Sequence, residues 1–134
     1  ERVELEFFRR FLGGNPIVVP VPLHPKRLKE RGFNQAEKIA NYEAGIMNLE
    51  VRNILTRVKE TKPQVGKKRE ERLRAMEGAF QINKTSPLIP LLNSGEGKIL
   101  LVDDVWTTGA TMKECARVLR QGGVRRIWGL VLAR

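Results

Sequence analysis

The segment from Lys98 to Gly123 constrains the fold most, because it places a buried strand, two carboxylates and a helix directly after one another. Its apolar run over 99–102 is typical of a strand buried on both faces of a parallel sheet. Asp103 and Asp104 follow where that strand is expected to end. A helix is predicted beyond the next turn and up to two glycines, because four side chains recur at helical spacing on one face: Met112, Cys115, Ala116 and Leu119.

The turn between the acidic pair and this helix is predicted to seat a phosphate group. The start of a helix offers unpaired N–H groups and a partial positive charge, and Gly109 lets the backbone approach an anion closely. Two aspartates beside a phosphate would repel it unless they accept hydrogen bonds from vicinal sugar hydroxyls or help to hold Mg²⁺. The segment therefore predicts a ribose 5-phosphate site, against the simpler alternative of a solvated acidic turn. The turn lacks the glycine patterns of a P-loop and of a dinucleotide-binding fold.

Three stretches of the chain resemble a known family. The phosphoribosyl-pyrophosphate (PRPP) motif of type I phosphoribosyltransferases is similar to the stretch 102–111, VDDVWTTGAT. Resemblance to the ComF competence-protein branch of that superfamily is carried by PVPLHPKRLKERGFNQAE at 20–37 and TKPQVGKKREERLRAMEGAF at 61–80. The resemblance covers roughly 17–134. It implies an α/β chain with the type I phosphoribosyltransferase fold, in which helices flank a mainly parallel central sheet.

This resemblance also implies which residues bind the ligand. Asp103 and Asp104 would hold the ribose hydroxyls at the catalytic centre, with Mg²⁺ held beside them through the ligand and not by a metal site of the protein. The 5′-phosphate would lie against five residues of the turn: Thr107, Thr108, Gly109, Ala110 and Thr111. Pyrophosphate would meet the segment after the first strand: Lys26, Arg27, Arg31 and Gly32. A flexible basic loop over 59–75 would close on PRPP, with four residues that match the family pattern: Thr61, Gln64, Arg69 and Arg72.

The basic segment 59–75 has a second interpretation. Glu70, Glu71 and Arg74 have the spacing of ion pairs on a helix surface, which favours an exposed charged helix that orders on binding. Lys67 and Ala75 depart from the residues usual in the family at these positions.

Hydrophobic patterning places the other elements around this centre. Four segments are expected before residue 51: a helix over 1–14, a strand over 17–22, a basic loop over 24–31, and a helix from Asn34 to Tyr42 or beyond. Asn34 and Glu37 have the spacing of a capping box. Strands are expected within 51–58, 78–82 and 127–133, with a loop over 83–97. Strands that alternate with helices predict a mainly parallel sheet with ligands at the carboxyl ends of its strands.

The composition predicts one domain over 1–134, with 41% hydrophobic residues to form its core. No apolar run approaches the about 18 residues of a membrane span, and no secretory signal pattern is visible, so a cytoplasmic protein without a membrane span is expected. The only cysteine, Cys115, lies on the apolar helix face, which favours a core residue over a nucleophile or a metal ligand. The only histidine, His24, is interpreted as a loop residue and not as a catalytic base.

The chain opens on Glu1 and not on Met, which predicts a fragment or a processed form. ComF proteins typically begin with a cysteine-rich zinc-binding module, and the sequence contains no such pattern. The apolar stripe expected over 1–14 would then lack a covering neighbour, which favours the contacts of a homodimer or poor solubility.

The formal net charge of +10 predicts anionic partners, and the segment 57–74 carries half of it. Pyrophosphate, a nucleotide and nucleic acid all fit this charge. The first hypothesis is a PRPP-binding enzyme that transfers the 5-phosphoribosyl group to a nitrogenous acceptor and releases pyrophosphate, with the role in competence that the ComF resemblance implies. The alternative is a non-catalytic component of DNA uptake that binds single-stranded DNA or other competence proteins and keeps the fold as a scaffold or as a PRPP sensor.

Overall fold

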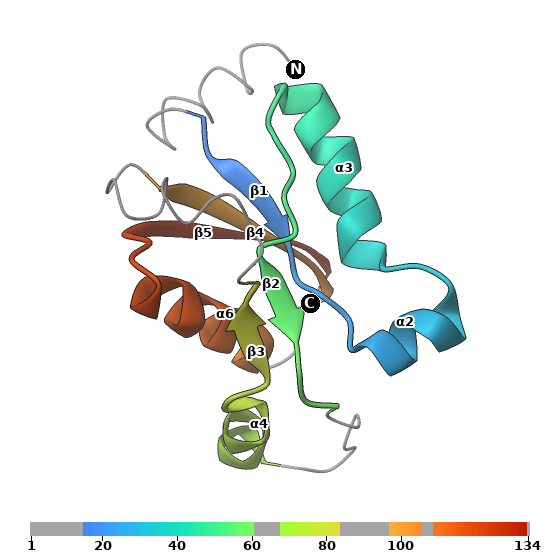
Figure 1. The fold of residues 1–134 in the computed structure, drawn as a ribbon, viewed down its shortest axis with the longest axis vertical. Helices are drawn as coiled ribbons and strands as arrows, with labels where there is room; N and C mark the ends of the chain where they lie inside the picture. The colour runs from blue at the N-terminus through green and yellow to red at the C-terminus, as the bar shows by residue number, and fades with distance from the viewer. Residues whose placement is uncertain (1–14, 61–67, 84–96, 106–108, 134) are drawn as a thin grey trace.

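The structure is a computed structural model, and it describes residues 15–60, 68–83, 97–105 and 109–133. Strands and helices are interspersed along these residues (Figure 1). In chain order they are β1 (Ile17–Pro20), α2 (Pro25–Arg31), α3 (Gln35–Met47), β2 (Leu55–Arg57), α4 (Arg69–Met76), β3 (Phe80–Ile82), β4 (Lys98–Val105), α6 (Ala110–Gln121) and β5 (Arg126–Ala133). The helix expected over 1–14 lies outside the described residues. None of the helices in the described ranges is long and apolar enough to span a membrane.

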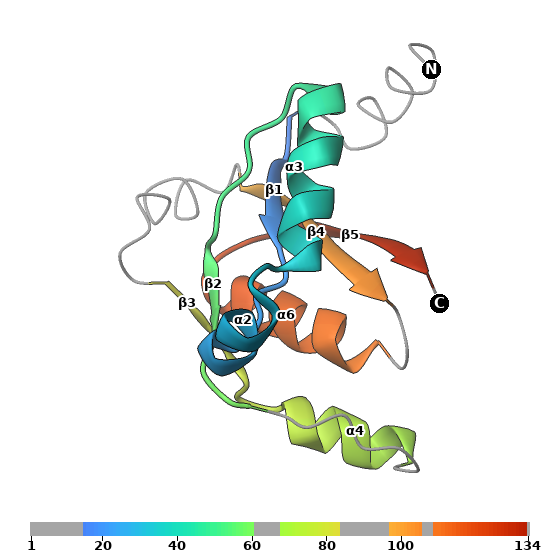
Figure 2. The ribbon, with the colours of Figure 1, turned by 90° about the vertical axis from the view of Figure 1, so that its right-hand side faces the viewer.

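β4 is the central strand of a three-stranded parallel sheet with the order β1-β4-β5. Residues 99–102 pair with 17–20 of β1 and with 127–130 of β5. Because side chains alternate along a strand, the sheet has two apolar faces. α3 packs on the face that includes Leu100, and α6 packs on the opposite face with Leu101 (Figure 2). Cover on both faces explains why the apolar run of β4 is uninterrupted.

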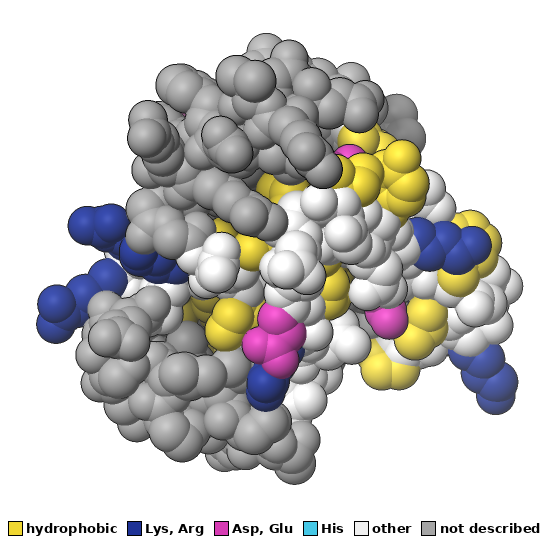
Figure 3. All heavy atoms as spheres, turned by 90° about the horizontal axis from the view of Figure 1, so that it is seen from above, with side chains coloured by type: hydrophobic (Ala, Val, Ile, Leu, Met, Phe, Trp, Pro, Cys, Tyr) yellow, Lys and Arg dark blue, Asp and Glu magenta, His cyan; other side chains and the backbone are white. Residues whose placement is uncertain are grey.

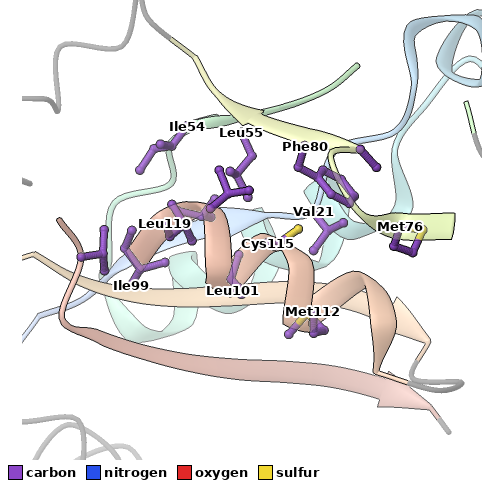
Figure 4. Packing of buried hydrophobic residues seen from close by; sticks show 14 of the residues in the cluster. Val21, Ile54, Leu55, Met76, Phe80, Ile99, Leu101, Met112, Cys115 and Leu119 are labelled. Carbon is purple, nitrogen blue, oxygen red and sulfur yellow. The ribbon is translucent and has the colours of Figure 1, made fainter. Parts of the chain in front are cut away.

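The larger core cluster lies between the parallel sheet and α6. Figure 4 shows Ile99 and Leu101 of β4 beside Cys115 and Leu119 of α6, and all four side chains are almost fully buried. The expectation that Cys115 is a core residue is thus confirmed. Burial raises the pKa of its thiol far above the ordinary range, so the residue is unsuited to act as a nucleophile.

β4 is longer than the sequence predicts. It was expected to end before the acidic pair, but it continues through Asp103 and Asp104 to Val105. The reason is its long partner β5, in which Val131 pairs with Asp103 and Ala133 pairs with Val105. The two carboxylates therefore belong to the last residues of a hydrogen-bonded strand, which fixes their backbone more firmly than a loop would.

The strand expected within 51–58 does not join the parallel sheet. Val51 forms an isolated parallel bridge with Val18 of β1, whereas β2 pairs antiparallel with β3 in a second, two-stranded sheet. The expectation of a mainly parallel central sheet is confirmed by β1, β4 and β5, whereas the separate antiparallel pair of β2 and β3 was not predicted. This pairing buries Leu55 and Phe80 on the cluster around α6, which favours it over an extension of the larger sheet.

The expectation of a basic loop over 24–31 is also wrong, because the segment contains the helix α2. His24 caps this helix, since its Nδ1 accepts a hydrogen bond from the N–H of Lys26 at 3.2 Å, and Pro25 follows at the first helical position. The helix ends at Gly32, whose φ of 80° is the left-handed conformation that glycine favours. α2 buries none of its residues, so no apolar periodicity in the sequence indicates it.

Asn34 begins α3, as predicted, and it also closes the base of the α2 segment. Its Oδ1 accepts a hydrogen bond from the N–H of Ala36 at 3.1 Å. Its Nδ2 donates to the carbonyl oxygen of Val21 at 3.0 Å. The N–H of Val21 donates in turn to the carbonyl oxygen of Val102 in β4 at 2.8 Å. One side chain therefore ties the two ends of the α2 segment together beside the central strand.

Asn34→Ala is expected to lower the free energy of unfolding by about 1–2 kcal/mol, because it removes a helix cap and leaves the Val21 carbonyl without this donor. Urea unfolding measures the change. Asn34→Asp keeps the acceptor but not the donor, so it separates the two contributions. Asn41→Ala, at an exposed position of the same helix, is the control and should be neutral or slightly stabilising. Equal effects of the alanine substitutions at 34 and 41 would contradict the proposed closure.

Candidate functional site

Several groups that the sequence predicts to bind ligand meet at the carboxyl edge of the parallel sheet. β1 and β4 both end at this edge, and α6 begins beside the end of β4 (Figures 1 and 2). Asp103 and Asp104 close the central strand, and Gly109 precedes the first turn of α6. α2, with Lys26 and Arg27, follows the end of β1. The carboxyl edge of a parallel sheet covered on both faces is the usual place for a ligand.

Gly109 is the N-terminal cap of α6 and adopts a left-handed conformation with φ 78°. A residue with a β-carbon would be strained there, so the conformation itself accounts for the glycine. Its carbonyl accepts the N–H of Lys113 at 2.9 Å, which closes the first turn of the helix. Ala110 is buried and Thr111 is half-buried in this turn. The two other predicted phosphate ligands, Thr107 and Thr108, lie outside the described residues.

Asp103 lies in a mostly buried environment, and its protonation is the main electrostatic feature of the site. Burial raises the pKa of the Asp103 carboxyl to about 7, and a hydrogen bond with the Asp104 side chain adds to the rise. The backbone N–H of Asp104 donates to Asp103 Oδ1 at 2.9 Å, and this bond, like the charge of Arg57, acts in the opposite direction. Near neutral pH the Asp103 carboxyl therefore exists in both forms, and a bound cation or hydroxyl donor would favour the ionised form.

Arg57, at the end of β2, is a member of the site that the sequence did not single out. Its guanidinium lies over the ring of Phe80, 5.4 Å from the ring centre, and its Nη2 lies 3.9 Å from Met76 Sδ. Burial lowers the pKa of Arg57 and the charge of Arg27 lowers it further, whereas Asp103 raises it. Arg57 is thus within electrostatic range of both α2 and the acidic pair. In the sequence it appears only as one cation of a long basic stretch, so its position between these two groups could not be foreseen.

The residues predicted to meet pyrophosphate lie on α2 and at its end. Arg27 is half-buried, Arg31 is exposed in the last turn, and Gly32 caps the helix. Lys26 Nζ lies 3.8 Å from Glu60 Oε2, an ion pair that joins α2 to the chain beyond β2. Because both partners are solvent-accessible, this pair is weak and can exchange for a ligand.

The second half of the predicted flexible loop is helical. Arg69 and Arg72 lie on α4, as the alternative interpretation of a charged helix predicts. Two glutamates lie in the first turn of α4, where their negative charge interacts favourably with the helix dipole. Met76 is the only buried residue of this helix. Thr61 and Gln64, the other two candidate loop residues, lie outside the described residues.

The chain is thus an α/β protein whose sheet edge collects a helix start, two carboxylates and cations from two neighbouring elements. Comparison with known proteins identifies its relatives. The chain is 34% identical over 119 residues to Competence protein F of Haemophilus influenzae, an alignment that covers 87% of this chain and 50% of that protein. It is 36% identical over 116 residues to Competence protein ComFC of Streptococcus pneumoniae, with 87% and 47% covered.

A third relative is Competence protein ComFC of Bacillus subtilis, which is 38% identical over 108 residues, or 80% of this chain and 39% of that protein. No family model matches the chain. The three matches show that the chain is a homologue of Competence protein F and ComFC, and they confirm the ComF resemblance of its motifs. The chain spans half the length, or less, of these curated relatives.

Asp103→Asn is expected to stabilise the protein in a pH-dependent way. An unfolded aspartate titrates near 3.8 and folded Asp103 near 7, so ionisation opposes folding between these values. The free energy of unfolding of the wild type should fall below that of the variant as the pH rises from about 4 to about 7, and the gap should then stay constant at on the order of 4 kcal/mol. Urea unfolding at several pH values measures it. Asn41→Ala removes no titratable group and serves as the reference. If the difference in free energy of unfolding already has its full size at pH 4, the raised pKa of Asp103 is contradicted.

Proposed function

We propose that the carboxyl edge of the sheet binds PRPP or a related ribose 5-phosphate, and that the chain has the type I phosphoribosyltransferase fold. One observation supports this most: Asp103 and Asp104 end the central strand, and the left-handed Gly109 begins the next helix. The carboxylates would accept hydrogen bonds from the two ribose hydroxyls, and the helix start would receive the 5′-phosphate. A ribose 5-phosphate carries its hydroxyls and its phosphate a few bonds apart in one molecule, which matches this arrangement.

The pyrophosphate of PRPP would meet cations on the α2 side of the acidic pair. Burial lowers the pKa of Arg57 most, and the nearby positive charge of Arg27 lowers it further, so the two cations repel one another in the free protein. An anion with several charges would relieve that repulsion. Arg31 extends this cationic surface along α2. The backbone at Gly32 follows at the end of the helix. The sugar and the pyrophosphate would then lie on neighbouring strands of the same edge.

As an enzyme, the chain would transfer the 5-phosphoribosyl group to a nitrogenous acceptor. The bond from C1 of the ribose to pyrophosphate breaks, pyrophosphate leaves with the bonding electrons, and the acceptor nitrogen bonds to C1 and loses its proton. Arginines that neutralise the leaving group and carboxylates that fix the ribose would supply most of the rate, so no nucleophile of the protein is required. We propose that the basic segment 59–75, with Arg69 and Arg72 of α4, shields the reacting carbon from water.

Mg²⁺ fits the donor atoms of this site. Asp103 and Asp104 supply the carboxylate oxygens that the ion prefers, and the ion would supply charge neutralisation at the pyrophosphate. Within the described ranges no group of three or more His, Cys, Asp and Glu side chains could hold a metal. The ion would lie beside the acidic pair and be held through oxygens of the ligand. The names of its relatives support a role for this chain in competence.

The variant with both Asp103→Asn and Asp104→Asn is expected to lose PRPP binding by at least about tenfold while its melting temperature stays equal or rises. Isothermal titration of PRPP with Mg²⁺ into the wild type and the variant measures the loss. The matched control, Glu70→Gln with Glu71→Gln, removes two adjacent exposed carboxylates from α4 and should retain binding. Because the site variant becomes more positive, simple charge attraction predicts tighter binding. Unchanged or tighter binding would therefore refute the assignment of the acidic pair.

Single-stranded DNA is a second candidate ligand, in a non-catalytic role. Lysines and arginines project from both sides of the molecule seen in Figure 3, and the exposed cations of α2 and α4 add to the net charge of +10. If three phosphates were neutralised, affinity for a short oligothymidylate would fall about 20-fold between about 50 and about 200 mM salt. Fluorescence anisotropy measures this slope. Binding that PRPP does not displace would support a separate DNA surface, whereas displacement by PRPP would contradict it.

A further inference from the structure

Glu114 of α6 is the one charged residue that is buried among those the structure describes, with 6% of its surface exposed. Its Oε1 accepts the backbone N–H of Gly78 at 3.3 Å. Arg117 Nε donates to Oε1 and Oε2 at 2.9 and 3.0 Å, and Arg117 Nη2 donates to Oε1 as well. A buried carboxylate is costly unless it is paired in this way, so the position of Glu114 is tied to that of both partners.

The backbone partner, Gly78, lies in the turn between α4 and β3. Its φ of 72° fixes the turn in the left-handed conformation, and the N–H of Ala79 donates to the carbonyl of Met76 at 3.0 Å. Met76 and Leu73 attach the same end of α4 to the core. The carboxyl-terminal end of α4 is thus held by two apolar side chains and by the bond from Gly78 to Glu114.

This attachment sets where α4 lies relative to the start of α6. The two helices are neighbours in both ribbon views (Figures 1 and 2). A cleft of about 490 Å³ separates them, and six residues line it: Leu73, Glu77, Ala110, Lys113, Glu114 and Arg117. One wall of the cleft therefore reaches Ala110, the first residue of α6, while the opposite wall is the helix that carries Arg69 and Arg72.

We infer that Glu114 is a positioning residue: by holding Gly78 it keeps α4 docked on α6, and so fixes where the α4 arginines lie relative to the start of α6. Glu114 itself does not touch the ligand. The consequence for ligand affinity rests on the proposed PRPP site, whereas the docking of α4 does not. The two parts can therefore be tested separately on the same variants.

The sign of the effect on affinity separates positioning from simple electrostatics. Removal of a carboxylate near an anion site should strengthen the binding of PRPP, because the site becomes more positive. Loss of a docked α4 should weaken it, because the arginines are no longer held in place. The Arg117 side chain is 48% exposed, so its guanidinium can be solvated when its partner is removed. A weakened affinity after Glu114→Ala would thus have the opposite sign from the charge effect.

The experiment compares wild type with Glu114→Ala, Glu114→Gln and the control Glu71→Ala, which removes an exposed carboxylate of α4. Amide hydrogen exchange is followed by mass spectrometry over 69–78, with α3 as the internal reference. We expect exchange over 69–78 to become about tenfold faster in Glu114→Ala, with α3 unchanged. Glu114→Gln keeps the shape of the side chain and an oxygen acceptor, so it should give an intermediate value. In Glu71→Ala, the rate of amide exchange around Gly78 should equal that of wild type.

PRPP affinity is then measured on the same proteins by calorimetry. Glu114→Ala should weaken binding about threefold or more, and Glu71→Ala should leave it equal or slightly tighter. If Glu114→Ala does not fold, Glu114→Gln replaces it in both the hydrogen-exchange and the affinity measurement. Wild-type exchange over 69–78 in the Glu114 variants would overturn the docking role, and faster exchange with unchanged or tighter PRPP binding would overturn the positioning role. If wild type binds no PRPP, the proposed function fails, and the exchange result still decides whether Glu114 docks α4.

Discussion

Burial of β4 on both faces is the constraint on which the rest of the structure depends. Leu100 is covered by α3 and Leu101 by α6, so a shift of the strand by one residue would exchange two apolar layers that are packed against different helices. The strand is therefore fixed in position and in register. Asp103 and Asp104 are the last polar residues of that same strand, and their backbone inherits this rigidity. Binding groups are held more precisely on a rigid element of this kind than on a loop.

The electrostatics of the site reflect a compromise with this packing. The face of β4 that carries Leu101 also carries Asp103, so the carboxyl lies close to the apolar cluster and its pKa rises. Arg57 approaches from β2 and partly offsets that cost, although its own guanidinium is also partly buried and lies near Arg27. The free protein thus holds charges that are individually unfavourable. Charged groups placed in this way gain most from a ligand with both hydroxyl donors and negative charge.

Local patterns in the sequence predicted the central strand, α6 and the cap of α3 at Asn34, because burial and capping depend on neighbours close in the chain. α2 was missed because a short helix without buried residues leaves no hydrophobic pattern. The antiparallel pairing of β2 with β3 was missed because it joins segments more than twenty residues apart. Arg57 escaped notice for the same reason, since its role depends on Asp103, which is distant in the sequence. The site was thus predictable where it lies on β4 and α6, and not where tertiary contacts complete it.

The closure at Asn34 has a consequence for how such a site can diversify. The α2 segment leaves the sheet at Val21 and returns at Asn34, where one side chain joins its two ends. Between these points it contributes nothing to the buried cluster. Substitutions, and even changes of length, within this segment would leave the core untouched while they alter the charge and shape that face a ligand. The molecule therefore separates the packing that holds the fold from the segment that carries the cations Lys26, Arg27 and Arg31.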